Sequence, residues 1–176
     1  MRNLNLENVE EKKGFGGPEP GGYVLKIINV QDVPSKEYLK IDYDFADGEY
    51  ANHYLNLFDK FGFWGGTMYK SYKEKSLGWF KAFISDVEAS NPGYKWDNDE
   101  KKLEEKLFGA VLGAEEYRGN DGEVKESLKV KKTAPIQDIR DGKFKIPKLK
   151  KLEESNTSNE VVDASAPSID ADDIPF

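Results

Sequence analysis

Two alternating runs joined by a turn make up residues 38–58, YLKIDYDFADGEYANHYLNLF. In the first run, residues 38–46, aliphatic and aromatic side chains occupy every second position, which is typical of a strand with one buried face. Asp47-Gly48 is a dipeptide characteristic of tight hairpins. Residues 50–58 alternate again, so the sequence predicts a hairpin whose second arm is the third strand of the chain.

The alternation also predicts which side chains of this third strand are buried. Leu55 and Leu57 would face the core, which leaves Tyr54 and Phe58 on the outer face. His53 shares the parity of Leu55, so we expect a hydrogen-bonded core histidine rather than a catalytic base.

The flanking segments supply the other elements. Residues 23–33 are rich in aliphatic and β-branched residues and predict the first strand. Residues 76–90 place Leu77, Phe80, Ile84 and Val87 on one helical stripe behind Ser76, a suitable N-cap. A shorter helix is expected at residues 98–107, with Leu103 and Leu107 facing inward. Residues 108–118 and 123–133 predict a β-hairpin around Gly119-Asn120-Asp121-Gly122.

The predicted order is three strands, a helix and two strands, which places the chain in the mainly β class. This is the order of an OB-fold, a five-stranded Greek-key barrel that binds nucleic acid across its second and third strands and its loops. The alternative is another small β-barrel or sandwich with the helix packed at one end.

Composition argues against most enzyme classes. The chain has no cysteine and a single histidine, His53, which excludes disulfides, thiolate zinc sites and paired-imidazole chemistry. Asp42 and Asp44 share a strand face, but no further carboxylate converges on them, so a solvated face is favoured over a metal-dependent nuclease. Glycine-rich residues 14–22 lack a phosphate-loop motif and predict a flexible entry to the first strand. We therefore expect a protein that is not an enzyme and has no cofactor.

The C-terminal 24 residues have a different composition. Residues 153–176 contain seven acids and no Lys or Arg, so they account for the whole net charge of −7. Such a segment buries too little apolar surface to fold alone, and we expect it to be disordered. It ends in an apolar group beside acids, at Asp172, Asp173, Ile174, Pro175 and Phe176, which suggests a docking tip for partner proteins.

Aromatic and basic residues are interleaved between the predicted third strand at 50–58 and the predicted helix at 76–90. Single-stranded nucleic acid is bound by aromatic rings that stack on bases and by cations that follow the phosphates. Lysines of the C-terminal hairpin share one parity, opposite Val124, Leu128 and Val130, and the first strand connection adds a basic rim. The predicted DNA-binding residues are Lys36, Lys40, Tyr54, Phe58, Lys60, Phe61, Phe63, Trp64, Tyr69, Lys70, Tyr72, Lys73, Arg118, Lys125, Lys129 and Lys131.

The ending DDIPF resembles the C-terminal tip of bacterial and phage single-stranded DNA-binding proteins. The segments GFWGG, SYKEKS, SNPGYKW, EEYRGNDGEV and FKIPKLKK resemble a phage family associated with replication and recombination. The resemblance implies an OB-fold DNA-binding domain over residues 1–152, a tail over residues 153–176, and recruitment of replication or recombination proteins by the tip. No apolar run is long enough to span a membrane, so we expect a cytoplasmic protein, in the host cell if phage-encoded.

Two rival functions stay open on the sequence alone. Because residues 1–152 carry no net charge, the chain could be a protein-binding adaptor or inhibitor whose acidic tail mimics DNA. It could also be an oligomeric strand-annealing recombination protein. The number of subunits is not specified by any sequence feature.

Overall fold

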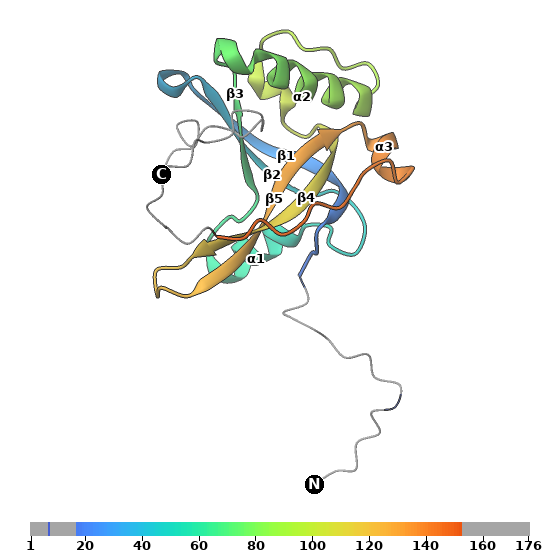
Figure 1. Ribbon diagram of the computed structural model, residues 1–176. Helices are drawn as coiled ribbons and strands as arrows, with labels where there is room; N and C mark the ends of the chain where they lie inside the picture. The colour runs from blue at the N-terminus through green and yellow to red at the C-terminus, as the bar shows by residue number, and fades with distance from the viewer. Residues whose placement is uncertain (1–6, 8–16, 153–176) are drawn as a thin grey trace.

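The computed structural model describes residue 7 and residues 17–152 (Figure 1). The predictions made for residues 153–176, including the docking tip at 172–176, lie outside the described residues.

The core of the molecule is an antiparallel five-stranded sheet of order β3-β2-β1-β4-β5. Its strands are β1 (Gly21–Val33), β2 (Tyr38–Phe45), β3 (Thr67–Ser71), β4 (Leu107–Arg118) and β5 (Val124–Ala134). The helices are α1 (His53–Phe61), α2 (Leu77–Ser90) and α3 (Ile136–Arg140), with short 3-10 turns at Pro34–Lys36, Glu74–Ser76 and Glu100–Leu103.

The general prediction is confirmed: the fold is mainly β, with five strands and a helix between β3 and β4. This arrangement is compatible with an OB-like fold. Within the described part of the chain, β3 and β5 form the two edges of the sheet and do not pair with each other.

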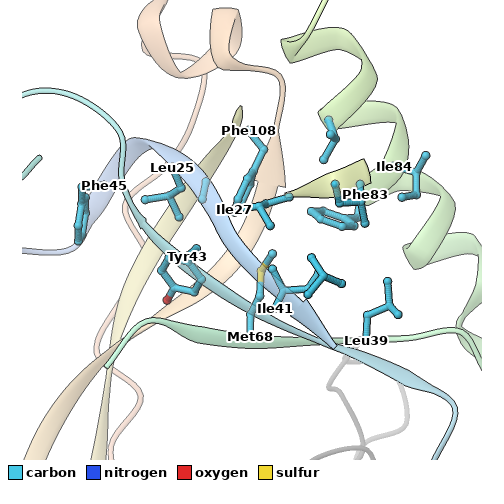
Figure 2. Close-up of a cluster of buried hydrophobic side chains, with 14 of the residues drawn as sticks. Leu25, Ile27, Leu39, Ile41, Tyr43, Phe45, Met68, Phe83, Ile84 and Phe108 are labelled. Carbon is cyan, nitrogen blue, oxygen red and sulfur yellow. The ribbon is translucent and has the colours of Figure 1, made fainter. Parts of the chain in front are cut away.

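Large side chains fill the inner face of the sheet beneath α2 (Figure 2). Ile27 of β1, Ile41 of β2 and Phe108 of β4 are fully buried, and α2 adds Phe83 and Val87. The edge of the Phe108 ring meets Phe83 at a centroid distance of 5.8 Å. The helical stripe predicted for 76–90 therefore faces the core, except that Leu77 at its start is exposed.

The prediction of a third strand at 50–58 is wrong, because His53–Phe61 form helix α1 and the third strand is Thr67–Ser71. A run of nine residues fits both the two-residue period of a strand and the 3.6-residue period of a helix. Tertiary contacts therefore decide between the two structures. The Asp47-Gly48 turn is present, with Gly48 at a φ of 78°, but it leads to α1 instead of a hairpin partner.

A buried carboxylate explains this helix. Asp44, at the end of β2, is only 2% exposed, so the prediction of a solvated side chain at this position is also wrong. Its Oδ1 accepts hydrogen bonds from the backbone N–H groups of Phe45 (2.8 Å) and Tyr54 (2.9 Å), and its Oδ2 accepts one from Leu55 (3.0 Å). Two of these donors belong to the first turn of α1, whose N–H groups have no partner within the helix. Asp44 therefore caps α1 from a neighbouring strand.

The short helix predicted at 98–107 is shorter than expected. A single 3-10 turn, Glu100–Leu103, replaces it, and Leu107 begins β4. Leu103 is fully buried as predicted, whereas Leu107 is half-buried.

Residues 143–152 form an extended segment, here called the strap, that crosses the outer side of the sheet after α3 (Figure 1). Phe144 covers Gly22 so closely that an added Cβ there would lie 2.5 Å from its ring. Lys150 pairs with β4: its N–H donates to the carbonyl of Ala114 (3.0 Å), and its carbonyl accepts from the N–H of Glu116 (2.9 Å). The strap thus covers part of the β4 edge that β1 leaves free.

None of the helices in residues 17–152 has the length and apolar character required to cross a membrane.

We expect Asp44→Ala to lower the free energy of unfolding by at least about 2 kcal/mol, because a buried polar group left without a partner costs about 1–3 kcal/mol. Urea unfolding followed by circular dichroism measures this loss. Asp47→Ala is the matched control, since it removes the same charge from an exposed ion pair with Arg140, which contributes about 0–1 kcal/mol. Equal stability of the two variants would contradict the capping role of Asp44.

Candidate nucleic-acid interface

Helix α1 presents apolar side chains to solvent. Leu55, Phe58, Phe61 and Phe63 form what we call the aromatic surface, with exposed fractions of 45%, 47%, 66% and 56%. The first three follow one another at intervals of three residues, which places them on adjoining parts of the helix surface. Lys60 is also exposed on this helix.

The segment after α1 folds back onto the helix and fixes the rings. Gly62, with a φ of 75°, ends α1 and its N–H donates to the carbonyl of Phe58 (2.8 Å). Phe63 then stacks on Phe61 at a centroid distance of 6.3 Å and an interplanar angle of 30°. Trp64 lies 6.2 Å from the Phe58 ring, and its Nε1 donates to the carbonyl of Gly66 (2.8 Å).

Tyr54 is not part of this surface, although the sequence predicted it on an outer face. It is buried, with its ring 5.8 Å from Tyr43 and 5.6 Å from Phe45, and burial raises its pKa to about 12. A Cβ at Gly66 would lie 2.4 Å from the Tyr43 carbonyl and 2.5 Å from the Tyr54 ring. The glycine therefore allows Tyr54 to anchor α1 to the core.

His53 lies half-buried at the start of α1 rather than on a strand. Its ring contacts those of Phe45 (5.9 Å), Tyr50 (6.2 Å) and Tyr54 (5.2 Å). Burial lowers its pKa below the ordinary value, in part offset by the nearby Asp44 charge. In the described residues, no group of three or more histidine or acidic side chains is arranged to hold a metal ion.

The outer face of β2 and β3 carries polar and aromatic side chains. Lys40 lies opposite Tyr69 in the β2–β3 register, and both are half-buried. The Tyr69 ring meets the buried Tyr38 ring edge-on at 5.2 Å. Beside them, Thr67 Oγ1 donates to Asp42 Oδ1 (2.7 Å), so Asp42 also has a structural partner. Lys36 is exposed in the 3-10 turn before β2.

Tyr72 belongs to the other end of the molecule. Its hydroxyl donates to Asp32 Oδ1 (2.7 Å), and its ring meets Phe80 of α2 edge-on at 6.2 Å. Helix α1 and helix α2 lie at opposite ends of the sheet (Figure 1). Tyr72 and the half-buried Lys73 after it are therefore separated from the aromatic surface.

Lys70 points to the inner side of the sheet, because it pairs in register with the buried Leu39. Its Nζ lies 5.2 Å from the centre of the Phe83 ring. Desolvation lowers its pKa to about 8, although the attraction of Asp86 opposes the shift. Lys70 thus lies on the opposite side of β3 from Tyr69, and the structure does not place it with the other predicted DNA-binding residues.

The hairpin of β4 and β5 carries exposed cations: Lys125, Lys129 and Lys131 lie on its outer face, as predicted, whereas Arg118 pairs in register with Val124 on the opposite face. Two are held by partners near the turn: Arg118 donates to the carbonyl of Gly122 (2.8 Å), and Lys125 pairs with Asp121 (3.1 Å). Lys131 pairs with Glu115. Lys129 is exposed and forms no salt bridge with any residue that the structure describes.

The structure therefore groups the predicted residues into three sets. The first set is the aromatic surface, in which Leu55 joins Phe58, Phe61 and Phe63. The strand interpretation had placed Leu55 in the core. The spacing of 55, 58 and 61 was the available signal for this exposed stripe. The second set is Lys40 and Tyr69 on the outer face of β2 and β3, and the third is the outer face of the β4–β5 hairpin. Lys36, in the turn before β2, lies at the Tyr72 end of these strands, because the Tyr72 N–H donates to the carbonyl of Glu37 (2.9 Å).

No protein-family model and no curated protein matches the chain.

We expect the stability of the wild-type protein to increase between about pH 8 and pH 10.5 through Lys70. The pKa of this group is lower in the folded state than its ordinary 10.5, so in that interval the unfolded chain binds more protons and rising pH favours folding. Lys70→Met should be more stable than wild type at pH 7 and should lose this part of the pH dependence. Urea unfolding of both proteins at pH 7, 9 and 10.5 tests this; a constant difference in stability across the three pH values would contradict it.

Proposed function

We propose that this protein binds single-stranded DNA without sequence preference, and that it does so as a non-enzymatic OB-fold protein. The observation that carries the proposal is the set of exposed rings Phe58, Phe61 and Phe63. Phe58 and Phe61 lie on α1 and Phe63 follows it, and α1 is joined to a sheet whose strand order and helix position are compatible with an OB-like fold.

Exposed rings of this kind suit base stacking. Each base presents a π face whatever its identity, so an array of aromatic rings binds single strands with little sequence preference. Base pairing and stacking make the same faces inaccessible in duplex DNA. Phe61 and Phe63 already stack on each other, so a base added beside them would extend a stack that exists in the free protein.

Cations would contact the phosphates. Lys60 lies on α1 beside the rings, and Lys40 lies on β2; Lys36 lies in the turn before β2, at the end of that strand away from α1. Lys125, Lys129 and Lys131 supply a row on the β4–β5 hairpin. In an OB-fold, nucleic acid crosses the second and third strands and the loops beside them. OB barrels are partly open, so two edge strands that do not pair, β3 and β5, fit this fold.

The proposal extends to the acidic C-terminal residues. Asp172, Asp173, Ile174, Pro175 and Phe176 would dock replication or recombination proteins, with the apolar side chains in a shallow pocket and the carboxylates on basic residues. The protein would thereby coat and protect single strands during phage DNA replication or recombination and recruit enzymes to them.

The exposed apolar surface of α1 also supports a rival function. Leu55, Phe58, Phe61 and Phe63 could dock a protein, because contiguous apolar patches mark protein interfaces as well as ligand sites. The chain would then be an adaptor or inhibitor that does not bind DNA. An oligomeric strand-annealing protein is a further alternative, which sedimentation with and without DNA would reveal as rings or filaments.

We expect oligo-dT to quench tryptophan fluorescence strongly and a duplex of the same length to quench it weakly. Trp64 is the reporter, because its ring lies 6.2 Å from Phe58. Trp79→Phe and Trp96→Phe remove the two other tryptophans, which lie at or after the distant helix α2. Rising salt should weaken the binding, because it opposes counterion release. Absence of both a fluorescence change and a gel shift would favour the adaptor.

Phe61→Ala should reduce the affinity for oligo-dT by about 1–3 kcal/mol, the usual cost of losing one stacking ring. Its side chain is 66% exposed, so folding should be unaffected. Trp79→Ala is the matched control, because Trp79 is 63% exposed on α2 at the other end of the sheet. Fluorescence anisotropy of labelled oligo-dT measures both. An equal loss of affinity in the two variants would contradict a stacking role for the aromatic surface.

A further inference from the structure

A second basic region lies on the outer side of the sheet, next to the β4–β5 hairpin, and shares Lys131 with it. A hollow of about 800 Å³ is bounded by β5, the α3 region and the strap, and four lysines and two aspartates line it. The lysines are Lys131, Lys132, Lys143 and Lys145. Val111, Phe144 and Pro147 supply an apolar wall.

The two aspartates of this hollow do not neutralise its four lysines. Asp86 Oδ2 accepts a hydrogen bond from Thr133 Oγ1 (2.7 Å), and its pKa is raised by burial, which disfavours the charged form. Lys132 and Lys145, by contrast, are exposed and form no salt bridge with the residues that the structure describes. The hollow therefore has positive charge available for an anion.

The strap continues this positive charge along the molecule. It carries five exposed lysines, which we call the strap lysines: Lys143, Lys145, Lys148, Lys150 and Lys151. Within the described residues only Lys143 forms a salt bridge, and that is a long one, 4.0 Å to Asp141. Five lysines within the nine residues 143–151 suit a polymer of phosphates better than a single ion.

The strap is held in place through its backbone and its apolar side chains, so the lysines are free to bind. Phe144 packs on Gly22, and Pro147 lies where a Cβ on Gly113 would be 3.0 Å from it. Lys150 pairs with β4 through main-chain hydrogen bonds, and the Leu152 N–H donates to Glu116 Oε2 (3.0 Å). Substitution of the lysine side chains would leave these contacts in place.

The strap lysines adjoin the hairpin already proposed to contact DNA. Gly113, which Pro147 covers, is the direct register partner of Lys129 on β5. The exposed cations of the hairpin and those of the strap therefore follow one another across β4 without an intervening element. A bound strand that leaves the hairpin would meet the strap next.

We propose that the strap lysines, together with the hollow that Lys143 and Lys145 help to line, form a second phosphate-binding track, over which single-stranded DNA continues from the β4–β5 hairpin. This inference rests on the proposed single-strand binding. The track would lengthen the stretch of DNA that one domain covers, because it adds phosphate contacts beyond those near the aromatic surface. It supplies no base-stacking array, so its contribution is electrostatic and sensitive to salt.

The test compares two full-length triple variants that lose the same charge. The strap variant is Lys145→Gln, Lys148→Gln and Lys150→Gln; the control variant is Lys81→Gln, Lys95→Gln and Lys106→Gln, which alters lysines on α2 and beyond it. Affinity for oligo-dT of about 16 nucleotides and of about 5 nucleotides, near the limits for one OB fold, is measured by anisotropy at several salt concentrations.

For the longer oligonucleotide we expect the strap variant to bind on the order of 10-fold more weakly than the control at low salt. For this variant the slope of log affinity against log salt concentration should be smaller in magnitude by about 2, because each phosphate contact on a single strand contributes about 0.7 to that slope. Binding of the shorter oligonucleotide should not distinguish the variants. Circular dichroism checks that both fold alike.

Three results would overturn the inference, and they can be told apart. If wild type binds oligo-dT and the two variants behave alike, the track is absent but the proposed function stands. If the strap variant binds DNA more tightly than wild type, the strap lysines hold the chain's own acidic residues 153–176 instead of DNA. If wild type does not bind oligo-dT at all, the proposed function fails and this inference fails with it.

Discussion

The carboxylate of Asp44 determines how the middle of the chain folds. It is buried at the end of β2 and accepts three backbone hydrogen bonds, two of them from the first turn of α1. A carboxylate removed from water is stable only when its oxygens are so satisfied. The chain after β2 must therefore bring N–H groups to this position, and a helix start supplies them. The direction of α1, the anchoring of Tyr54 and the exposure of Phe58 and Phe61 all follow from this contact.

Four of the five strands could be predicted from the sequence. β2 alternates apolar and charged side chains, β1 is rich in aliphatic and β-branched residues, and β4 and β5 flank a Gly-Asn-Asp-Gly turn. Helix α2, with 14 residues, is equally clear. The nine residues of α1 satisfy both periods, and the deciding partner, Asp44, lies on another element. β3 has only five residues and its short run gave no comparable signal.

The candidate site was predictable in composition but not in orientation. The density of rings and lysines between residues 54 and 73 identified the region, and Phe58, Phe61 and Phe63 are exposed there. In a strand Tyr54 and Leu55 would lie on opposite faces, whereas in a helix their directions differ by about 100°. The strand pattern therefore assigned the wrong side to each: Tyr54 is buried and Leu55 is exposed. Lys70 lies inside because its neighbours in the β2–β3 register, not its own charge, determine the side of the sheet it occupies. A cation above the Phe83 ring is a tertiary arrangement that no local pattern specifies.

The contact between Phe144 and Gly22 joins the first strand to one of the last described segments of the chain. More than a hundred residues separate the two partners, so this contact closes a very long loop, and contacts of high sequence separation form late in folding. During synthesis β1 emerges from the ribosome first, yet its outer side stays open to solvent until the strap has been made. Gly22 is therefore uncovered until residue 144 has been made, and the β4 edge, complete at residue 118, stays free until residue 150 follows; in that interval it could pair with other chains.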